Sequence, residues 1–157
     1  MSSFNYTIAI DAMGGENSPK KVIEGISLFL KEDKEVFFNI FGKEALIINE
    51  ISQYKNIVPQ NYKIVNCESQ IEDKNSVRDA IKVGKDSSMW KAIESVKNKE
   101  SHLIISSGNT GALLVISKLL IKMIDGIDKP AIAGLWPNLK GVSVVMDLGA
   151  NIEFNEK

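Results

Sequence analysis

The sequence contains few of the residues that build metal sites, disulfides and acid–base pairs. Cys67 is the only cysteine and His102 the only histidine, and only Arg78 among the nineteen basic residues is arginine. One cysteine cannot form an internal disulfide, and neither a CxxC pair nor a Cys/His cluster is present to hold zinc. The composition therefore favours a reducing compartment, and we interpret both lone residues as structural rather than catalytic.

An excess of charge of one sign and a long apolar run are also missing. Nineteen basic and twenty acidic residues give a formal net charge of -1, so no overall attraction to nucleic acid or to an anionic membrane is expected. The most apolar stretch, 111–124, is interrupted by Ser117, Lys118 and Lys122 and is shorter than the ~20 residues that cross a bilayer. The first residues lack the basic and apolar regions of a signal peptide. Any anion must therefore be bound locally.

Short apolar segments alternate with segments whose apolar residues recur at helical spacing. Such alternation predicts βαβ units, a mostly parallel sheet and helices on both of its faces. At 157 residues the chain is long enough for one domain, and we predict a single α/β domain over 1–157. The predicted strands are 7–12, 36–41, 62–65, 102–105, 131–135 and 142–146. The predicted helices are 19–30, 44–52, 77–83, a segment from 87 or 88 to 96 after a pause at Gly84, and 112–124.

Three loops follow strands in this interpretation, after Ile10, Ile105 and Met146. Ligands of parallel α/β sheets bind outside the carboxyl ends of the strands, so we expect these loops to converge on one crevice. Asp11 and Asp147 each close a strand, and Asn151 follows four residues after Asp147. Strand-end carboxylates suit orientation and proton handling, although an aspartate next to glycine commonly serves only a turn.

The most informative local pattern is the turn formed by residues 106–111 between a strand and a helix. The turn combines glycine with hydroxyl and amide side chains: Ser106, Ser107, Gly108, Asn109 and Thr110. Glycine lets a ligand approach the backbone closely, and the positive end of the following helix attracts an anion. Phosphate is the natural ligand, while plain capping of the helix is the alternative. Neither Walker A nor GxGxxG spacing is present.

A second anion-binding pattern precedes the helix that starts near residue 88. Lys82 and Lys85 lie ahead of the pair Ser87 and Ser88. An ammonium group acts on phosphate as a point charge, and serine hydroxyls donate hydrogen bonds to its oxygens. The alternative is a solvated surface followed by an ordinary N-cap.

Five motifs together resemble the bacterial phosphate acyltransferase family, in its order and near its spacing, over the whole chain. They are Asp11 to Gly15 with Pro19, Ser87 to Met89, Ser106 with Gly108 to Ala112, Gly126 to Asp128 with Pro130 and Ala131, and Asp147 to Asn151. The resemblance implies a three-layer α/β/α sandwich with a Rossmann-like sheet, related to isocitrate dehydrogenase and phosphotransacetylase folds. It implies transfer of a fatty acyl group from acyl carrier protein to inorganic phosphate, giving acyl phosphate for phospholipid synthesis.

The resemblance also implies which residues act, with phosphate itself as the nucleophile. The implied catalytic residues are Asn109, Asp147, Asn151 and Lys85. The residues implied to bind phosphate or substrate are Asp11, Gly14, Gly15, Lys82, Ser87, Ser88, Ser106, Gly108, Thr110, Gly111 and Gly149. The chain departs from the family at three positions, Glu16, Ser107 and Lys129, where aspartate, alanine and arginine are usual. Lysine lacks the planar fork of arginine, so a bidentate phosphate contact at Lys129 would be weaker.

The same resemblance sets expectations for partners and location. No metal or organic cofactor is implied. A cytoplasmic homodimer is expected, with peripheral membrane contact at most and a membrane acyltransferase as the downstream partner. Family members are about twice as long, so we expect this chain to correspond to the amino-terminal half of an enzyme. Two alternatives stay open, namely an acyl-CoA phosphotransacylase with the same phosphate pocket, and an inactive half that acts as a binding module or needs complementation.

Overall fold

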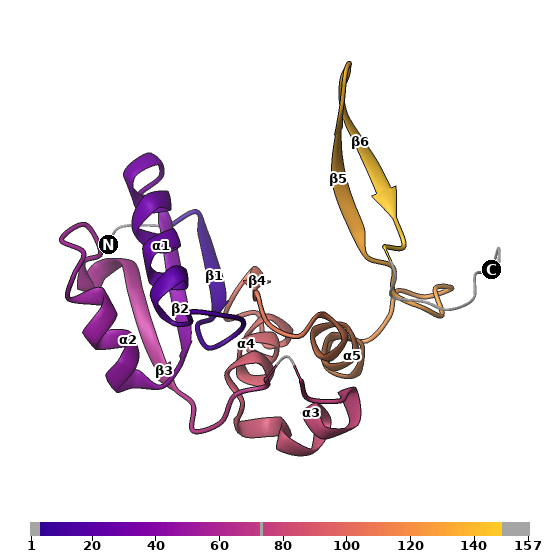
Figure 1. The fold of residues 1–157 in the computed structure, drawn as a ribbon, viewed down its shortest axis with the longest axis horizontal. Helices are drawn as coiled ribbons and strands as arrows, with labels where there is room; N and C mark the ends of the chain where they lie inside the picture. Colours follow the sequence, from indigo (N-terminus) through magenta and orange to yellow (C-terminus); the bar gives the residue numbers. More distant parts are fainter. Residues whose placement is uncertain (1–3, 73, 149–157) are drawn as a thin grey trace. The chain divides into compact units, whose positions relative to one another are not determined.

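A computed structural model describes residues 4–72 and 74–148 (Figure 1). The chain divides into two units, Met1–Ile121 and Lys122–Lys157. The strands of the first unit are β1 (Tyr6–Asp11), β2 (Val36–Gly42), β3 (Tyr62–Asn66) and β4 (Leu103–Ile105). Its helices are α1 (Lys20–Glu32), α2 (Glu44–Ile51), α3 (Val77–Val83), α4 (Ser88–Lys97) and α5 (Thr110–Ile121), with short 3-10 turns η1 (Pro59–Asn61) and η2 (Gly84–Asp86). The second unit contains β5 (Ala133–Asn138) and β6 (Gly141–Met146).

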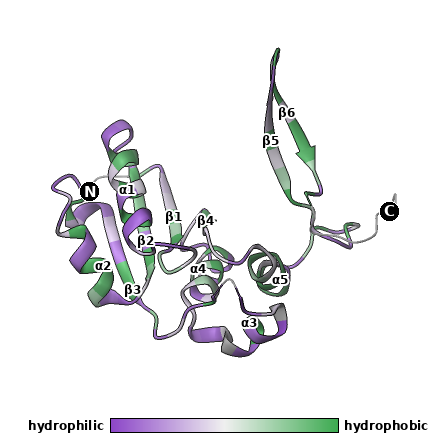
Figure 2. Ribbon diagram, in the orientation of Figure 1, coloured by the Kyte–Doolittle hydropathy of each residue, from purple (hydrophilic) through white to green (hydrophobic). Residues whose placement is uncertain are grey.

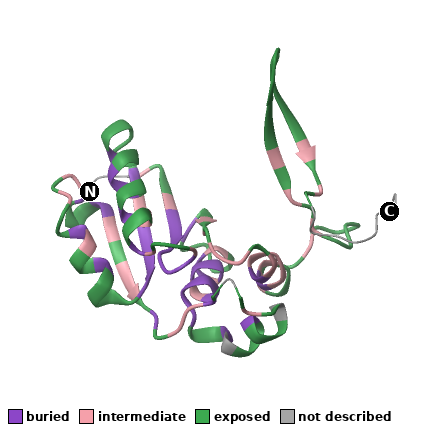
Figure 3. Ribbon diagram, in the orientation of Figure 1, coloured by how far each residue is buried: buried purple, intermediate pink, exposed green. Residues whose placement is uncertain are grey.

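The first unit is a four-stranded parallel sheet in the order β3-β2-β1-β4. Alternate residues of β1 face opposite sides, as the period of a strand requires. Ile8 and Ile10 belong to the core beneath α1 and α2, whereas Ala9 packs with Ala92 of α4 on the other face. Figure 3 shows buried residues concentrated in β1, β2 and α4. The predicted α/β architecture, a mostly parallel sheet between helical layers, is therefore confirmed.

The predicted interruption near Gly84 is also present. Gly84 has a φ of 41° and follows the last residue of α3, and the short turn η2 then leads into α4. The Ser87 hydroxyl accepts a hydrogen bond from the backbone N–H of Trp90, which makes Ser87 the N-cap of α4. The helix predicted over 112–124 is shifted in the structure, because α5 begins at Thr110 and ends at Ile121.

The two last predicted strands are present as β5 and β6, and the sequence left their pairing open. β5 and β6 pair antiparallel in a two-stranded sheet of their own, with Ala133 opposite Met146. Only Leu139 and Lys140 separate them, and a parallel pair needs a crossover of a dozen or more residues. Apolar residues along β6, green in Figure 2, are largely exposed in Figure 3. Residues 133–146 therefore form an antiparallel hairpin that is not part of the parallel sheet.

Among the residues that the structure describes, no helix combines the length and the hydrophobicity needed to cross a membrane.

Replacing Gly25 in the middle of α1 by Ala is expected to stabilise the chain. A Cβ added at Gly25 meets no atom within 4 Å, so the larger side chain has room. Glycine inside a helix is less favourable than alanine by about 0.8–1.0 kcal/mol. Urea unfolding followed by circular dichroism should show a free energy of unfolding raised by about 0.5–1 kcal/mol. A loss of stability would mean that the helix backbone at Gly25 is not regular.

Candidate phosphate site

Asp11, the last residue of β1, joins three separate segments of the first unit. Its side chain is 2% exposed, and both carboxylate oxygens accept hydrogen bonds. The Ser88 hydroxyl donates to Oδ1 at 2.6 Å and the Ser106 hydroxyl donates to Oδ2 at 2.7 Å, while the N–H of Met13 reaches Oδ1 at 3.3 Å. A buried carboxylate costs much desolvation energy unless it is hydrogen-bonded, and these donors supply that compensation. Asp11 therefore fixes the loops after β1 and β4 to the start of α4.

The loops after β1 and β4 touch through their glycines. A Cβ built on Gly14 would lie 2.7 Å from Asp11 Oδ2 and 2.8 Å from the backbone nitrogen of Gly108. A Cβ on Gly108 would lie 3.1 Å from the Cα of Gly14. Gly15 has a φ of 79°, and a Cβ there would collide with the carbonyl oxygen of Ser107. The sequence predicted that all three strand-end loops converge at one edge, and the structure brings two of them, the loops after β1 and β4, together.

Side-chain hydrogen bonds hold the turn between β4 and α5 in shape. The hydroxyl oxygen of Ser106 accepts from the N–H of Gly108 at 3.2 Å, and the hydroxyl of Ser107 donates to the Gly14 carbonyl at 3.2 Å. Thr110 opens α5 and is exposed, and Gly111 follows it in the first turn. The first N–H groups of a helix have no partners within the helix, so this end of α5 is suited to an anion.

The side chain of Asn109 makes structural contacts in addition to its predicted chemical role. Its Oδ1 accepts from the N–H of Ala112 at 2.9 Å, which caps α5. Its Nδ2 donates to the carbonyl of Asn75 at 3.1 Å, linking the turn to the loop before α3. The helix cap that the sequence offered as the alternative is therefore present in the structure. Together, these contacts make Asn109 a residue that positions the turn. Its catalytic role stays a prediction.

In the second anion-binding pattern the two serines are buried and the two lysines are exposed. Ser87 and Ser88 are both buried and already have partners, the N–H of Trp90 and the carboxylate of Asp11. Lys82 and Lys85 are exposed. The serines therefore hold α4 in place, Ser88 by its contact with Asp11 and Ser87 as the N-cap, and phosphate binding by these serines or by either lysine stays a prediction.

The predicted site residues beyond α5 belong to the second unit or lie outside the described residues. Asp147 follows β6 with a φ of 61°, and its N–H donates to the Ile132 carbonyl at 2.7 Å within the second unit. Gly149 and Asn151 lie outside the described residues. Convergence of this third loop with the other two therefore stays a prediction.

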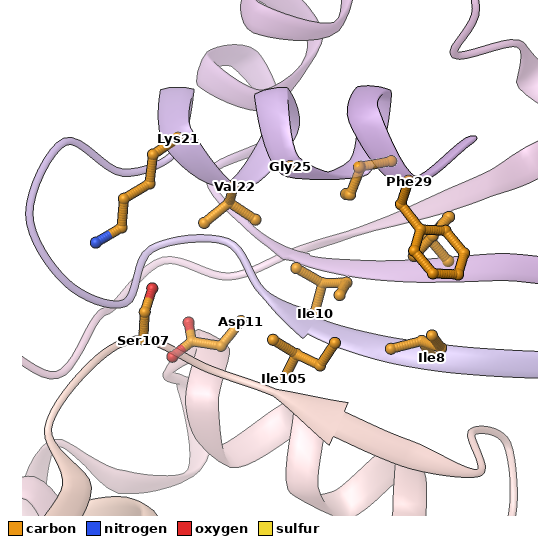
Figure 4. Close-up of a pocket in the computed structure, with 11 residues that line it drawn as sticks. Ile8, Ile10, Asp11, Lys21, Val22, Gly25, Phe29, Ile105 and Ser107 are labelled. Carbon is orange, nitrogen blue, oxygen red and sulfur yellow. The ribbon is translucent and has the colours of Figure 1, made fainter. Parts of the chain in front are cut away.

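Lys21, in the first turn of α1, is a candidate that the sequence analysis missed. Its Nζ lies 3.1 Å from the position of a Cβ on Gly15. Figure 4 shows Lys21, Ser107 and Asp11 together at one end of a cavity of about 290 Å³. The ion pairs found within the described residues, Lys74 with Glu72 and Lys91 with Asp86, do not involve Lys21. The local sequence around Lys21 carries no signal of this position.

The lone titratable residues have structural positions. His102 Nδ1 accepts from the N–H of Thr7 at 3.0 Å and so continues the pairing of β1 with β4. Cys67 is buried. Over residues 4–72 and 74–148, no group of three or more His, Cys, Asp and Glu side chains is arranged to hold a metal ion.

Cys67 is expected to react slowly with thiol reagents in the folded chain. Burial raises the pKa of its thiol from 9.0 to about 11, so the reactive thiolate at pH 8 is scarcer by roughly 100-fold than for an ordinary cysteine. Ellman's reagent should label Cys67 at least 100-fold more slowly in buffer than in 8 M urea. Equal rates would show that this core opens readily.

Comparison with known proteins gives the family. The family model described as "Fatty acid synthesis protein" matches residues 6–157. The phosphate acyltransferase of Pelagibacter ubique is 51% identical over 150 residues, which are 96% of this chain and 44% of that protein. The phosphate acyltransferase of Rhodospirillum rubrum is 39% identical over 153 residues, 98% of this chain and 44% of that protein. The chain spans less than half the length of these relatives and matches their amino-terminal half. It belongs to the fatty acid synthesis protein family, in which these relatives carry the name phosphate acyltransferase.

Proposed function

We propose that this chain supplies the phosphate site of an enzyme that transfers a fatty acyl group from acyl carrier protein to inorganic phosphate. The observation that carries the proposal is the Asp11 carboxylate, which draws the glycine turns after β1 and β4 together at the amino-terminal end of α5. The names of the relatives supply the two chemical classes, phosphate and acyl group. The acyl carrier and the product are parts of the proposal.

The site binds phosphate through backbone groups rather than through net charge. The chain has a formal charge of -1, so a local pocket is needed. The positive end of the α5 dipole, equivalent to about half an elementary charge, faces the turn at Gly108. Glycine at positions 14 and 108 lets the backbone of both loops come close to a bound oxyanion. Lys21 adds one full positive charge near the same turn.

Bound phosphate then acts as the nucleophile, and no Ser-His-Asp triad is needed. A phosphate oxygen attacks the thioester carbonyl carbon, the new C–O bond forms, and the C–S bond breaks. The carrier sulfur leaves as a thiolate and takes up a proton, and the products are acyl phosphate and the free carrier thiol. Preorganised N–H donors stabilise the negative charge that develops on the carbonyl oxygen, by about 3–4 kcal/mol for each donor.

Asn109→Ser separates the capping role of Asn109 from the roles of its amide NH2 group. Serine is as good an N-cap as asparagine, so the start of α5 should be retained. The hydroxyl is too short to replace the amide contact with the Asn75 carbonyl. If the amide acts on substrate or positions the turn through the Asn75 carbonyl, acyl-phosphate formation should fall at least 10-fold in Asn109→Ser with little change in stability. Full activity in Asn109→Ser would remove Asn109 from the proposed chemistry and leave it a cap.

Acyl-phosphate formation from palmitoyl-acyl carrier protein, with palmitoyl-CoA as the competing donor, tests the function itself. The assay uses the chain alone and the chain joined to the carboxyl-terminal part of the Pelagibacter relative. Preference for the carrier protein supports the proposal, and preference for CoA replaces it by a phosphotransacylase acting on acyl-CoA. Turnover only in the joined protein identifies this chain as a part that needs complementation. No acyl phosphate in any arm contradicts the proposal.

A further inference from the structure

One face of the first unit has an apolar groove that runs along α1. Figure 4 shows Val22, Gly25 and Phe29 of α1 on one side and Ile8, Ile10 and Ile105 of the sheet below. Its polar end holds Asp11, Lys21 and Ser107, beside the candidate phosphate site. The groove therefore continues the site along the sheet, away from the glycine turns.

The groove exists because a part of the sheet has no helix over it. Ile8 is aligned with Leu103 and Ile10 with Ile105, so these four side chains face the α1 side. Ile8 and Ile10 are buried, whereas Leu103 is 43% exposed and Ile105 is 52% exposed. Parallel sheets are normally covered on both faces, because their strands are apolar on both sides. The α1 face of β4 lacks that cover.

The composition of α1 points to a protein segment as the missing cover. Phe29 is 42% exposed on the groove side, although it lies on the apolar side of the helix. Gly25 is in the helix interior, where glycine is unfavourable, and no described atom lies within 4 Å of a Cβ added there, so packing among the described residues does not require a glycine. Gly25 has no Cβ, so a second backbone can approach α1 closely there, and the exposed ring of Phe29 one turn later offers an apolar contact.

We propose that this groove, defined by Val22, Gly25, Phe29 and Ile105, seats an apolar helical segment of the family's carboxyl-terminal part. The chain matches the amino-terminal half of its relatives, and the part of each relative that it leaves unmatched is longer than this chain. Helices are the elements that normally cover the faces of a parallel sheet, so a helical segment is the natural cover for the exposed face of β4 beside α1. Once seated, the segment closes one wall of the phosphate site at the end that holds Lys21 and Ser107. The inference does not depend on the proposed reaction.

Thiol labelling tests whether a segment docks in the groove, without any measurement of activity. Gly25→Cys places a thiol in the groove, where the added side chain has room, and Leu28→Cys places one on the same helix at a position 55% exposed and outside the groove. Cys67 is buried and gives a slow background. Each variant is labelled in the chain alone and in the chain joined to the carboxyl-terminal part of the Pelagibacter relative, with cooperative unfolding as the check of folding.

The two positions should diverge only in the joined protein. Gly25→Cys should react as fast as Leu28→Cys in the chain alone and at least 10-fold more slowly in the joined protein, while Leu28→Cys should be unchanged. Equal rates at Gly25→Cys in both proteins would overturn the proposal. Protection in the chain alone that grows with protein concentration would assign the groove to a second copy. Protection of the chain alone by dodecyl phosphate would assign it to an acyl ligand, and either result also overturns the proposal.

A second arm covers a joined protein that does not fold. The carboxyl-terminal part is co-expressed as a separate tagged chain, and copurification of this chain is measured. Gly25→Leu fills the groove and should reduce copurification at least 10-fold, while Leu28→Ala should retain it. The proposed docking is contradicted if the unsubstituted chain does not copurify, or if Gly25→Leu copurifies as well as the unsubstituted chain.

Discussion

Asp11→Asn should lower the free energy of unfolding of this chain by about 2–3 kcal/mol. The substitution removes one of the two buried carboxylate oxygens that accept hydrogen bonds from serine hydroxyls. In the unsubstituted chain the hydroxyls of Ser88 and Ser106 each donate a hydrogen bond to one carboxylate oxygen of Asp11. An amide presents only one oxygen, so one hydroxyl would face the NH2 group and lose its acceptor. The remaining hydrogen bond would be weaker, since its acceptor is no longer charged. Urea unfolding by circular dichroism measures the loss.

Asp79→Asn is the matched control for Asp11→Asn. Asp79 Oδ2 also accepts from a serine, Ser76, at 2.6 Å, but this pair is exposed. Water can replace an exposed hydrogen bond, so the expected cost is below about 1 kcal/mol. Equal losses in the two variants would show that burial of Asp11 has no energetic consequence, and the role assigned to it would be wrong.

Gly14→Ala should disrupt the contact between the loops after β1 and β4. The added Cβ would lie 2.7 Å from Asp11 Oδ2 and 2.8 Å from the Gly108 nitrogen, both closer than ordinary contact. Neither neighbour can turn away, since one is a carboxylate fixed by two serines and the other is backbone. Overpacking of this kind costs about 1–3 kcal/mol. The displaced turn should also bind phosphate at least 10-fold more weakly.

Gly25→Ala provides the comparison for Gly14→Ala, because the same methyl group is added where no atom lies within 4 Å. The two substitutions should shift the urea midpoint in opposite directions. A Gly14→Ala chain as stable as the unsubstituted chain would mean that the loops are farther apart in solution, and the predicted anion pocket would lose its geometry.

Much of the fold was predictable because the local patterns agree with the final structure. The helical spacing of Ile23, Ile26 and Leu30 predicts α1, and Ser87 ahead of Met89 predicts the restart at α4. Pairing of the last two strands was not predicted, because apolar segments alone do not report partner or direction. The two-residue connection at Leu139 and Lys140 decides that pairing.

The sequence predicted which residues form the candidate site but not which of them contact one another. Asp11, Ser88 and Ser106 were all singled out, yet each was interpreted as a phosphate or substrate contact. The structure shows hydrogen bonds between them across sequence separations of 77 and 95 residues, and their contact with phosphate stays a prediction. Local sequence carries no information on such pairs. Lys21 was missed for the same reason, since its place beside Gly15 depends on how α1 leaves the glycine loop.

Titration of the 15N-labelled chain with inorganic phosphate, followed by NMR, tests the central claim most directly. We predict saturable shifts of the backbone amides of Gly14, Gly108 and the first turn of α5, which are lost in Gly14→Ala and kept in Asp79→Asn. Shifts confined to the exposed segment of Lys82 and Lys85, or none that saturate, would contradict a phosphate site at the glycine turns.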